Sequence, residues 1–222
     1  MKKLLLAFLA IGPIAFAQHK NPNPGYWQQH VDYKMDVKMD VEKFQYSGTQ
    51  DLVYTNNSND TLKKVFYHLY FNAFQPGSEM DARLTAIADP DKRMVKSFKG
   101  PDGVEKKQSK ISELKPNEIG FLNVKELKQD GVLLKTKVVG TILEVELAKP
   151  ILPKAKTTLS MKFDGQVPVM VRRAGRNSDE GVALSMSQWY PKIAEFDFEG
   201  WHADPYIGRE FHGVWGDFDV KL

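Results

Sequence analysis

Every second residue from Val31 to Val41 is apolar, and this alternation constrains the fold more than any other feature of the chain. The residues between them are all aspartate or lysine. Side chains of a β-strand point alternately to opposite faces, so this pattern gives one buried face and one face in water. A helix would scatter the same apolar residues around its axis. The segment therefore predicts a half-buried strand.

Further segments of alternating or aromatic character follow at short intervals. Repeated short strands with turns between them are typical of an antiparallel sandwich. We therefore expect a mostly β chain, an antiparallel β-sandwich or saddle-like sheet domain with an irregular, aromatic-rich C-terminal segment. The expected strands are 44–54, with Gly48 as a bulge or close-packing point, and 65–74, 119–124, 132–138, 142–147, 157–163, 181–187 and 218–222.

Two segments interrupt the strand pattern. Residues 78–89 predict a short helix with Ser78 as its N-cap, ended by Asp89-Pro90. Residues 95–110 predict a hairpin that turns at Gly100-Pro101-Asp102-Gly103. No internal repeat is visible, and residues 31–222 are interpreted as one domain.

The N-terminus has the three parts of a secretory signal peptide. Lys2 and Lys3 give a positive start, an apolar stretch runs to Phe16, and Ala15-Phe16-Ala17 is an A-x-A site. We expect residues 1–17 to be removed, residues 18–30 to form an extended arm, and the protein to be exported, periplasmic or secreted. The apolar stretch is shorter than the about 20 residues that a membrane-spanning helix needs.

Composition narrows the choice of partners. The net charge is +3 and falls to +1 without Lys2 and Lys3, which gives no support to a nucleic-acid partner. The chain contains no cysteine, so an exported domain of this sequence must be stabilised by its core rather than by disulfides.

The common catalytic motifs are absent from the sequence. None of the five histidines is followed by glutamate, so H-E-x-x-H is missing, and no G-x-S-x-G or cysteine nucleophile occurs. Asp197, Glu199, His202 and Asp204 have side chains that could gather round calcium or zinc. Their spacing matches no metal-loop signature. A hydrogen-bonded packing surface is the preferred interpretation, with no catalytic residue, metal or cofactor in this chain.

The end of the sequence is dense in large aromatic residues. Exposed, they could stack on sugar rings; buried, they would form core and interface. Burial is the preferred interpretation because large aromatic side chains are more often buried than displayed. His68 is likewise expected in the core or an interface. The aromatic residues are Trp189, Tyr190, Trp201, Tyr206 and Trp215.

The order of several segments resembles the N-terminal, non-catalytic β domain of family M1 metallopeptidases, the gluzincin zinc aminopeptidases, in its exported bacterial form. The resemblance covers nearly all of residues 27–222 and is specific as a series. The segments that carry it are Trp27–Val31, Val65–Phe74, Phe163–Pro168, Ser187–Lys192, Gly200–His202 and Gly216–Val220.

The resemblance implies a function in a larger protein. In the family this domain precedes a thermolysin-like catalytic domain that holds zinc on H-E-x-x-H, so we expect the chain to be an N-terminal fragment that is inactive alone. The expected partners are that catalytic domain and a peptide substrate. The family's T-Q-x-E segment binds the amino end of the substrate. Here Ser187-Gln188-Trp189-Tyr190 stands in its place. Gln188 fits the pattern as a substrate-binding residue, whereas Tyr190 occupies the acidic position.

A second function from another class stays open. A stand-alone extracytoplasmic β-sandwich that binds carbohydrate would also have strands and clustered aromatic residues of this kind.

Overall fold

The structure is a computed structural model that describes residues 25–87, 90–169, 174–178, 180–208 and 211–222. The predicted signal peptide, residues 1–17, and the arm up to residue 24 lie outside the described residues. Among the described residues, no helix has the length and apolar character needed to cross a membrane.

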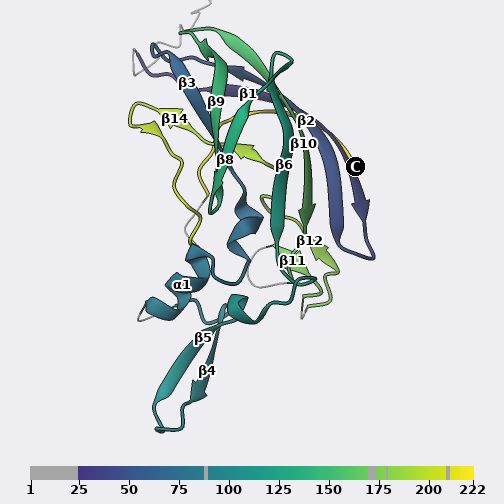
Figure 1. The fold of residues 1–222 in the computed structure, drawn as a ribbon, viewed down its shortest axis with the longest axis vertical. Coiled ribbons are helices and arrows are strands. Elements are labelled where there is room, and N and C mark those ends of the chain that lie inside the picture. The colour runs from purple at the N-terminus through teal and green to yellow at the C-terminus, as the bar shows by residue number, and fades with distance from the viewer. Residues whose placement is uncertain (1–24, 88–89, 170–173, 179, 209–210) are drawn as a thin grey trace, which may run out of the picture.

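The larger sheet has six strands in the order β16-β1-β2-β10-β6-β7. Neighbouring strands are antiparallel except β16, which pairs in parallel with β1 at the sheet edge. The pairing brings strands from both ends of the chain side by side (Figure 1). The strands are β1 (His30–Asp40), β2 (Gln45–Thr55), β6 (Phe121–Gln129), β7 (Val132–Leu133), β10 (Lys156–Gln166) and β16 (Gly216–Lys221).

A second, antiparallel sheet has four strands in the order β13-β3-β9-β8. These strands are β3 (Leu62–His68), β8 (Lys135–Val139), β9 (Ile142–Ile151) and β13 (Lys192–Ile193). Short hairpins complete the strands, namely β4 (Val95–Lys99) with β5 (Glu105–Ser109), β11 (Gly175–Arg176) with β12 (Leu184–Ser185), and β14 (Phe196–Asp197) with β15 (Gly200–Trp201).

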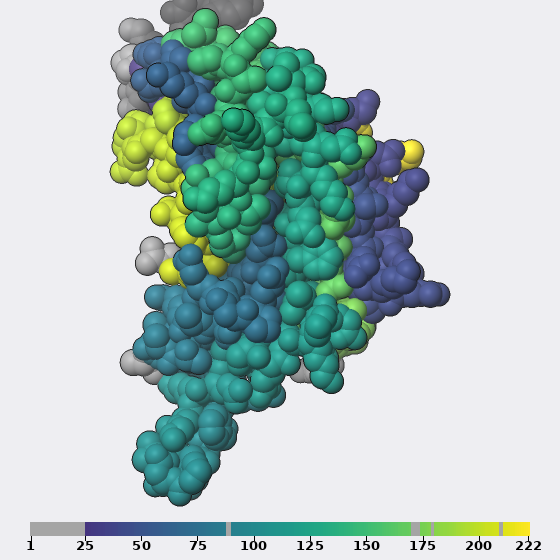
Figure 2. All heavy atoms as spheres, in the orientation of Figure 1, coloured from purple at the N-terminus to yellow at the C-terminus, as the bar shows by residue number. Residues whose placement is uncertain are grey.

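Helix α1 (Glu79–Ala86) and the β4–β5 hairpin lie at one end of the molecule (Figure 1). The hairpin projects as a narrow knob (Figure 2). As predicted, the Ser78 side chain caps α1, accepting a hydrogen bond from Asp81 N at 3.2 Å. The predicted hairpin at 95–110 is also confirmed.

The alternation in β1 places its apolar residues in the core. Val31, Tyr33, Met35 and Val37 are each less than 5% exposed, and they join one hydrophobic cluster with residues of both sheets. Val41 is 67% exposed because β1 ends at Asp40 and Val41 belongs to the following turn. The prediction of a mostly β, antiparallel fold is confirmed.

The sequence predicted Gly48 to be either a bulge or a close-packing point, and the structure shows a close-packing point. A Cβ there would lie 2.8 Å from Asp36 O and 2.9 Å from Phe163 Cζ. Pairing of β1 with β2 continues through Gly48 without a register shift. The absent side chain therefore lets three strands meet around the Phe163 ring.

Three predicted strands differ from the structure. The segment 65–74 is not one strand, because β3 ends at His68 and Tyr70–Ala73 form a 3₁₀ helix that buries Phe71 and Ala73. Segment 132–138 divides into β7 and β8, which belong to different sheets. Segment 181–187 contains only the two-residue strand β12.

Candidate functional site

Gln188 lies in the turn between β12 and β13, where it is half-buried and has a φ of 57°. A positive φ is uncommon outside glycine and costs conformational energy. Five other non-glycine residues in the described part of the chain also have a positive φ, so this conformation alone does not single Gln188 out. Two contacts hold the turn. The Tyr46 hydroxyl of β2 donates a hydrogen bond to the Trp189 carbonyl, and Lys192 Nζ lies 3.5 Å from Gln188 Oε1.

Lys192 and its neighbour anchor the other end of this turn to the core. Lys192 pairs with His68 across β13 and β3, and burial lowers the pKa of its ammonium below the ordinary value. Ile193 is fully buried, and its backbone N–H donates to the Tyr33 hydroxyl oxygen at 2.9 Å. The chain after Gln188 is thus held at Trp189 and at Lys192–Ile193, while Gln188 itself stays half-buried.

The β14–β15 hairpin follows and presents Asp197 and His202. Asp197 Oδ1 accepts a hydrogen bond from Glu199 N at 2.8 Å, and Asp197 Oδ2 lies 2.8 Å from His202 Nε2. Burial alone would raise the pKa of Asp197, but the Glu199 N–H and the His202 ring outweigh it and lower that pKa. The backbone N–H of His202 donates to Glu195 O at 2.9 Å and extends the hairpin.

His212 joins this pair from a different part of the chain. Its ring centroid lies 4.5 Å from that of His202. His68 Nε2 lies 3.1 Å from the His202 carbonyl oxygen, and burial lowers the pKa of His68 to about 4. His68 is therefore neutral at pH 7 and donates through Nε2. The neighbouring Glu195 is 7% exposed; burial and the charge of Asp197 raise its pKa to about 7.

The structure unites half of the residues singled out from the sequence as metal ligands. Asp197 and His202 come together, whereas Glu199 and Asp204 are exposed and outside the group. His212 takes their place, which sequence reasoning missed because it lies ten positions after His202 and no local motif relates the two. The prediction for His68 is confirmed, since it is 4% exposed.

The aromatic residues of this segment are mostly part of the core, as preferred from the sequence. Trp189, Tyr190 and Trp201 are half-buried against the main hydrophobic cluster, and Tyr206 is buried. Tyr190, in the position that is acidic in the resembled family, packs edge-on against Tyr33 at 5.4 Å. Trp215 differs, with 74% exposure. These aromatic residues therefore form no exposed stacking row, which removes the main support for carbohydrate binding.

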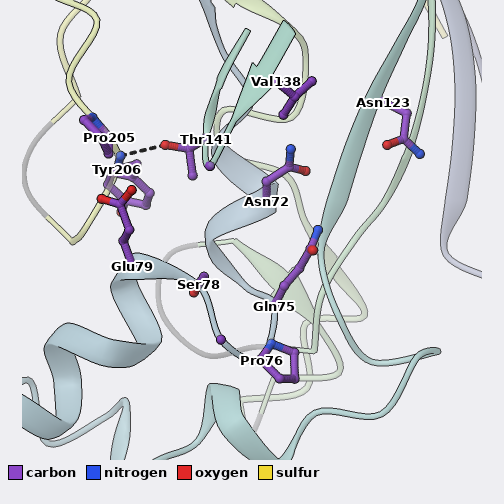
Figure 3. A pocket seen from close by; sticks show the side chains of 12 residues that line it. Asn72, Gln75, Pro76, Ser78, Glu79, Asn123, Val138, Thr141, Pro205 and Tyr206 are labelled. Carbon is purple, nitrogen blue, oxygen red and sulfur yellow. Dashed lines mark hydrogen bonds between the residues drawn. The ribbon is translucent and has the colours of Figure 1, made fainter.

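A polar pocket of about 320 Å³ lies beside the same segment (Figure 3). Its walls come from the 3₁₀ turn and the start of α1, from β6, from the β8–β9 turn and from Pro205 and Tyr206. Tyr206 N donates to Thr141 Oγ1 at 2.8 Å and closes one side. Two amide side chains that line the pocket already hydrogen-bond the backbone: Asn72 Oδ1 accepts from Leu122 N, and Gln75 Nε2 donates to Gly120 O. The pocket could hold a small polar ligand.

No protein-family model and no curated protein sequence matches the chain. Among solved structures, the chain is similar to zinc metallopeptidases of family M1. One is the M1 zinc metallopeptidase from Deinococcus radiodurans, with 14% identity over 72% of this chain and 26% of that chain, at a TM-score of 0.38. A mutant of it bound to a Tyr-Ser-Ala substrate gives 14% identity, 73% and 26% coverage and a TM-score of 0.38.

A two-domain M1 zinc metallopeptidase mutant bound to L-tryptophan gives 14% identity over 75% of this chain and 28% of that chain, with a TM-score of 0.38. The chain thus spans about a quarter of the length of the structures it matches, 26% to 28%. The likeness is a resemblance of structure and assigns no activity to this chain.

Proposed function

We propose that this chain is the N-terminal β domain of an exported zinc aminopeptidase of family M1, where it docks on a catalytic domain and helps to shape the peptide-binding cleft. The proposal rests on the series of resembling segments from Trp27 to Val220. The zinc of such an enzyme belongs to the catalytic domain. Residues 1–17 are the export signal.

The observation that carries the proposal is the fixed turn around Gln188. Tyr46 holds the carbonyl of the residue after Gln188, and Lys192 Nζ lies 3.5 Å from the oxygen of the half-exposed Gln188 amide. The oxygen of a glutamine amide accepts hydrogen bonds, and one made to a charged ammonium contributes about 1.5–3 kcal/mol. Gln188 can therefore exchange its long contact with Lys192 for the amino end of a peptide.

Exposed apolar side chains in the β14–β15 hairpin and in and before β16 support the docking role. Phe198 and Trp215 are 84% and 74% exposed. On β16, Phe218 is 49% exposed. Burying a large apolar side chain stabilises an association by about 1.5–3 kcal/mol. Two or three of them would make a substantial part of an interface with the catalytic domain.

The native polypeptide tests the proposal. Antibody against the purified chain should capture from the source cells a longer polypeptide whose peptide map contains an H-E-x-x-H sequence. Capture of a polypeptide that ends at Leu222 would contradict the proposal and favour a stand-alone module.

A further inference from the structure

We propose that Asp197, His202 and His212 together bind one divalent transition-metal ion of the zinc class, and that this ion ties the β14–β15 hairpin to the segment leading into β16. The site is distinct from the catalytic zinc of the proposed function, which belongs to another domain. It also differs from the sequence-based expectation of no metal in this chain.

The three side chains already converge. One ligand atom from each lies within 4.8 Å of the other two. Zinc bonds to histidine nitrogen and carboxylate oxygen measure about 2.0–2.2 Å, and tetrahedral geometry therefore places two ligands of one ion about 3.4 Å apart. Closing the site needs at most about 1.4 Å of movement. His212 can supply it because its side chain is exposed.

The backbone fixes two of the ligands before any metal arrives. Asp197 Oδ1 is held by the Glu199 N–H, which leaves Oδ2 directed at His202. His202 is held by its own N–H to Glu195 O and by the His68 ring on its carbonyl oxygen. Gly200, with a φ of 101°, allows the tight hairpin turn between them. Such outer contacts orient ligands and are a regular part of metal sites.

The His202 ring nitrogen Nε2 faces the Asp197 carboxylate at the centre of this group. This nitrogen is buried and lies 2.8 Å from Asp197 Oδ2, yet it makes no aligned hydrogen bond to any described residue. A metal ion between the ring nitrogen and the carboxylate would satisfy both atoms.

A second cluster on the molecule provides a contrast. His30, Asp32 and Asp217 also gather, but they offer a single imidazole and two carboxylates. The Asp217 side chain is 85% exposed, and His30 Nε2 already hydrogen-bonds Asp32 at 3.2 Å. Two imidazoles with one carboxylate suit zinc better, since imidazole is a preferred ligand of Zn²⁺, Cu²⁺ and Ni²⁺.

Metal titration of the purified chain tests the inference. Metal-free chain is titrated with Zn²⁺ by calorimetry and with Co²⁺ by visible absorption, which reports the ligand set. We expect one ion per chain. His212→Asn should weaken binding by at least about 100-fold, because even the loss of a group that merely orients a ligand costs about 10–100-fold. His30→Asn is the matched control and should bind as the wild type does.

Thermal unfolding gives an independent readout of the same site. Zn²⁺ should raise the unfolding temperature of the wild type and of His30→Asn, because an ion that binds only the folded chain stabilises it. The rise should vanish in His212→Asn, whose exposed position leaves the fold intact without metal. Absence of binding, equal binding by His212→Asn, or loss of binding in His30→Asn would each overturn the inference. None of these results depends on peptidase activity.

Discussion

The Tyr46 hydroxyl in β2 donates a hydrogen bond to the backbone carbonyl of Trp189, 143 positions later in the chain. The Tyr46 and Trp189 rings also meet edge-on, with centroids 5.8 Å apart. The larger sheet thereby holds the residue next to Gln188. The substrate-binding role proposed for Gln188 depends on this connection, because a freely moving amide would lose orientation before it could bind.

Tyr46→Phe should therefore lower stability and loosen the Gln188 turn. It removes one hydrogen bond and leaves the Trp189 carbonyl without that donor, which we expect to reduce the free energy of unfolding by about 0.5–1.5 kcal/mol. Urea unfolding measures this change, and amide hydrogen exchange at residues 187–190 should become faster than in the wild type.

Tyr67→Phe is the matched control. The Tyr67 hydroxyl is also buried, but it has no hydrogen-bond partner among the described residues. Its removal relieves a desolvation cost, so the free energy of unfolding should stay the same or rise. Equal destabilisation by the two substitutions would contradict the role given to the Tyr46 hydrogen bond.

Lys192 should make stability depend on pH in the alkaline range. Burial lowers its pKa in the folded chain from 10.5. Between the lowered value and 10.5 the unfolded chain binds a proton that the folded chain has released, so this group makes stability rise with pH. Wild type should gain stability relative to Lys192→Met as the pH approaches 10.5. Urea unfolding of both proteins tests this, and parallel pH profiles would show that Lys192 is not buried as described.

Export should remove residues 1–17. The motivation is the charged start, the apolar stretch and the Ala15-Phe16-Ala17 site. Mass spectrometry of the protein from the extracytoplasmic fraction should find Gln18 at the N-terminus. Recovery of intact Met1 in a membrane fraction would exclude cleavage.

The exposed apolar side chains of the C-terminal segment should make the isolated chain associate. Trp215→Ser combined with Phe198→Ser should reduce hydrophobic-dye binding and self-association, measured by light scattering. Leu133→Ser is the control, because Leu133 is 65% exposed on β7 in another part of the fold. A wild-type chain that is monomeric and binds no dye would argue against a docking surface here.

Local patterns predicted the regular strands but not the irregular segments. The alternation in β1 sufficed because the burial of one strand face follows directly from a period of two. The run Val65–Phe74 is aromatic and apolar except for His68 and Asn72, and periodicity cannot separate strand from helix in such a run. Its end became a 3₁₀ helix because Phe71 packs in the core and Asn72 accepts a hydrogen bond from Leu122 N.

The residues of the candidate site could likewise be predicted only where they lie close together in the sequence. Asp197 and His202 could be selected from the sequence because they share one short, acidic and aromatic segment. His212 could not, because it lies ten positions after His202 with no local motif relating the two, and only the folded chain brings their rings together. The hydrogen bond from Tyr46 to the Trp189 carbonyl could not be predicted either, because the two residues lie 143 positions apart in the sequence.

Measuring how Gln188 contributes to peptide hydrolysis tests the proposed function most directly. The native polypeptide, purified from its source cells, should hydrolyse aminoacyl p-nitroanilides in a reaction that a chelator abolishes and zinc restores, whereas the 222-residue chain alone should not. In that enzyme Gln188→Ala should lower kcat/KM by about 10–100-fold, the equivalent of a hydrogen bond to a charged group. Gln188→Gly removes the same amide while relaxing the positive φ, so it should match the alanine variant, and Gln28→Ala on the exposed arm should leave kcat/KM unchanged. An inactive native polypeptide, hydrolysis by the 222-residue chain itself, or an unchanged kcat/KM in both Gln188 variants would contradict the proposed function.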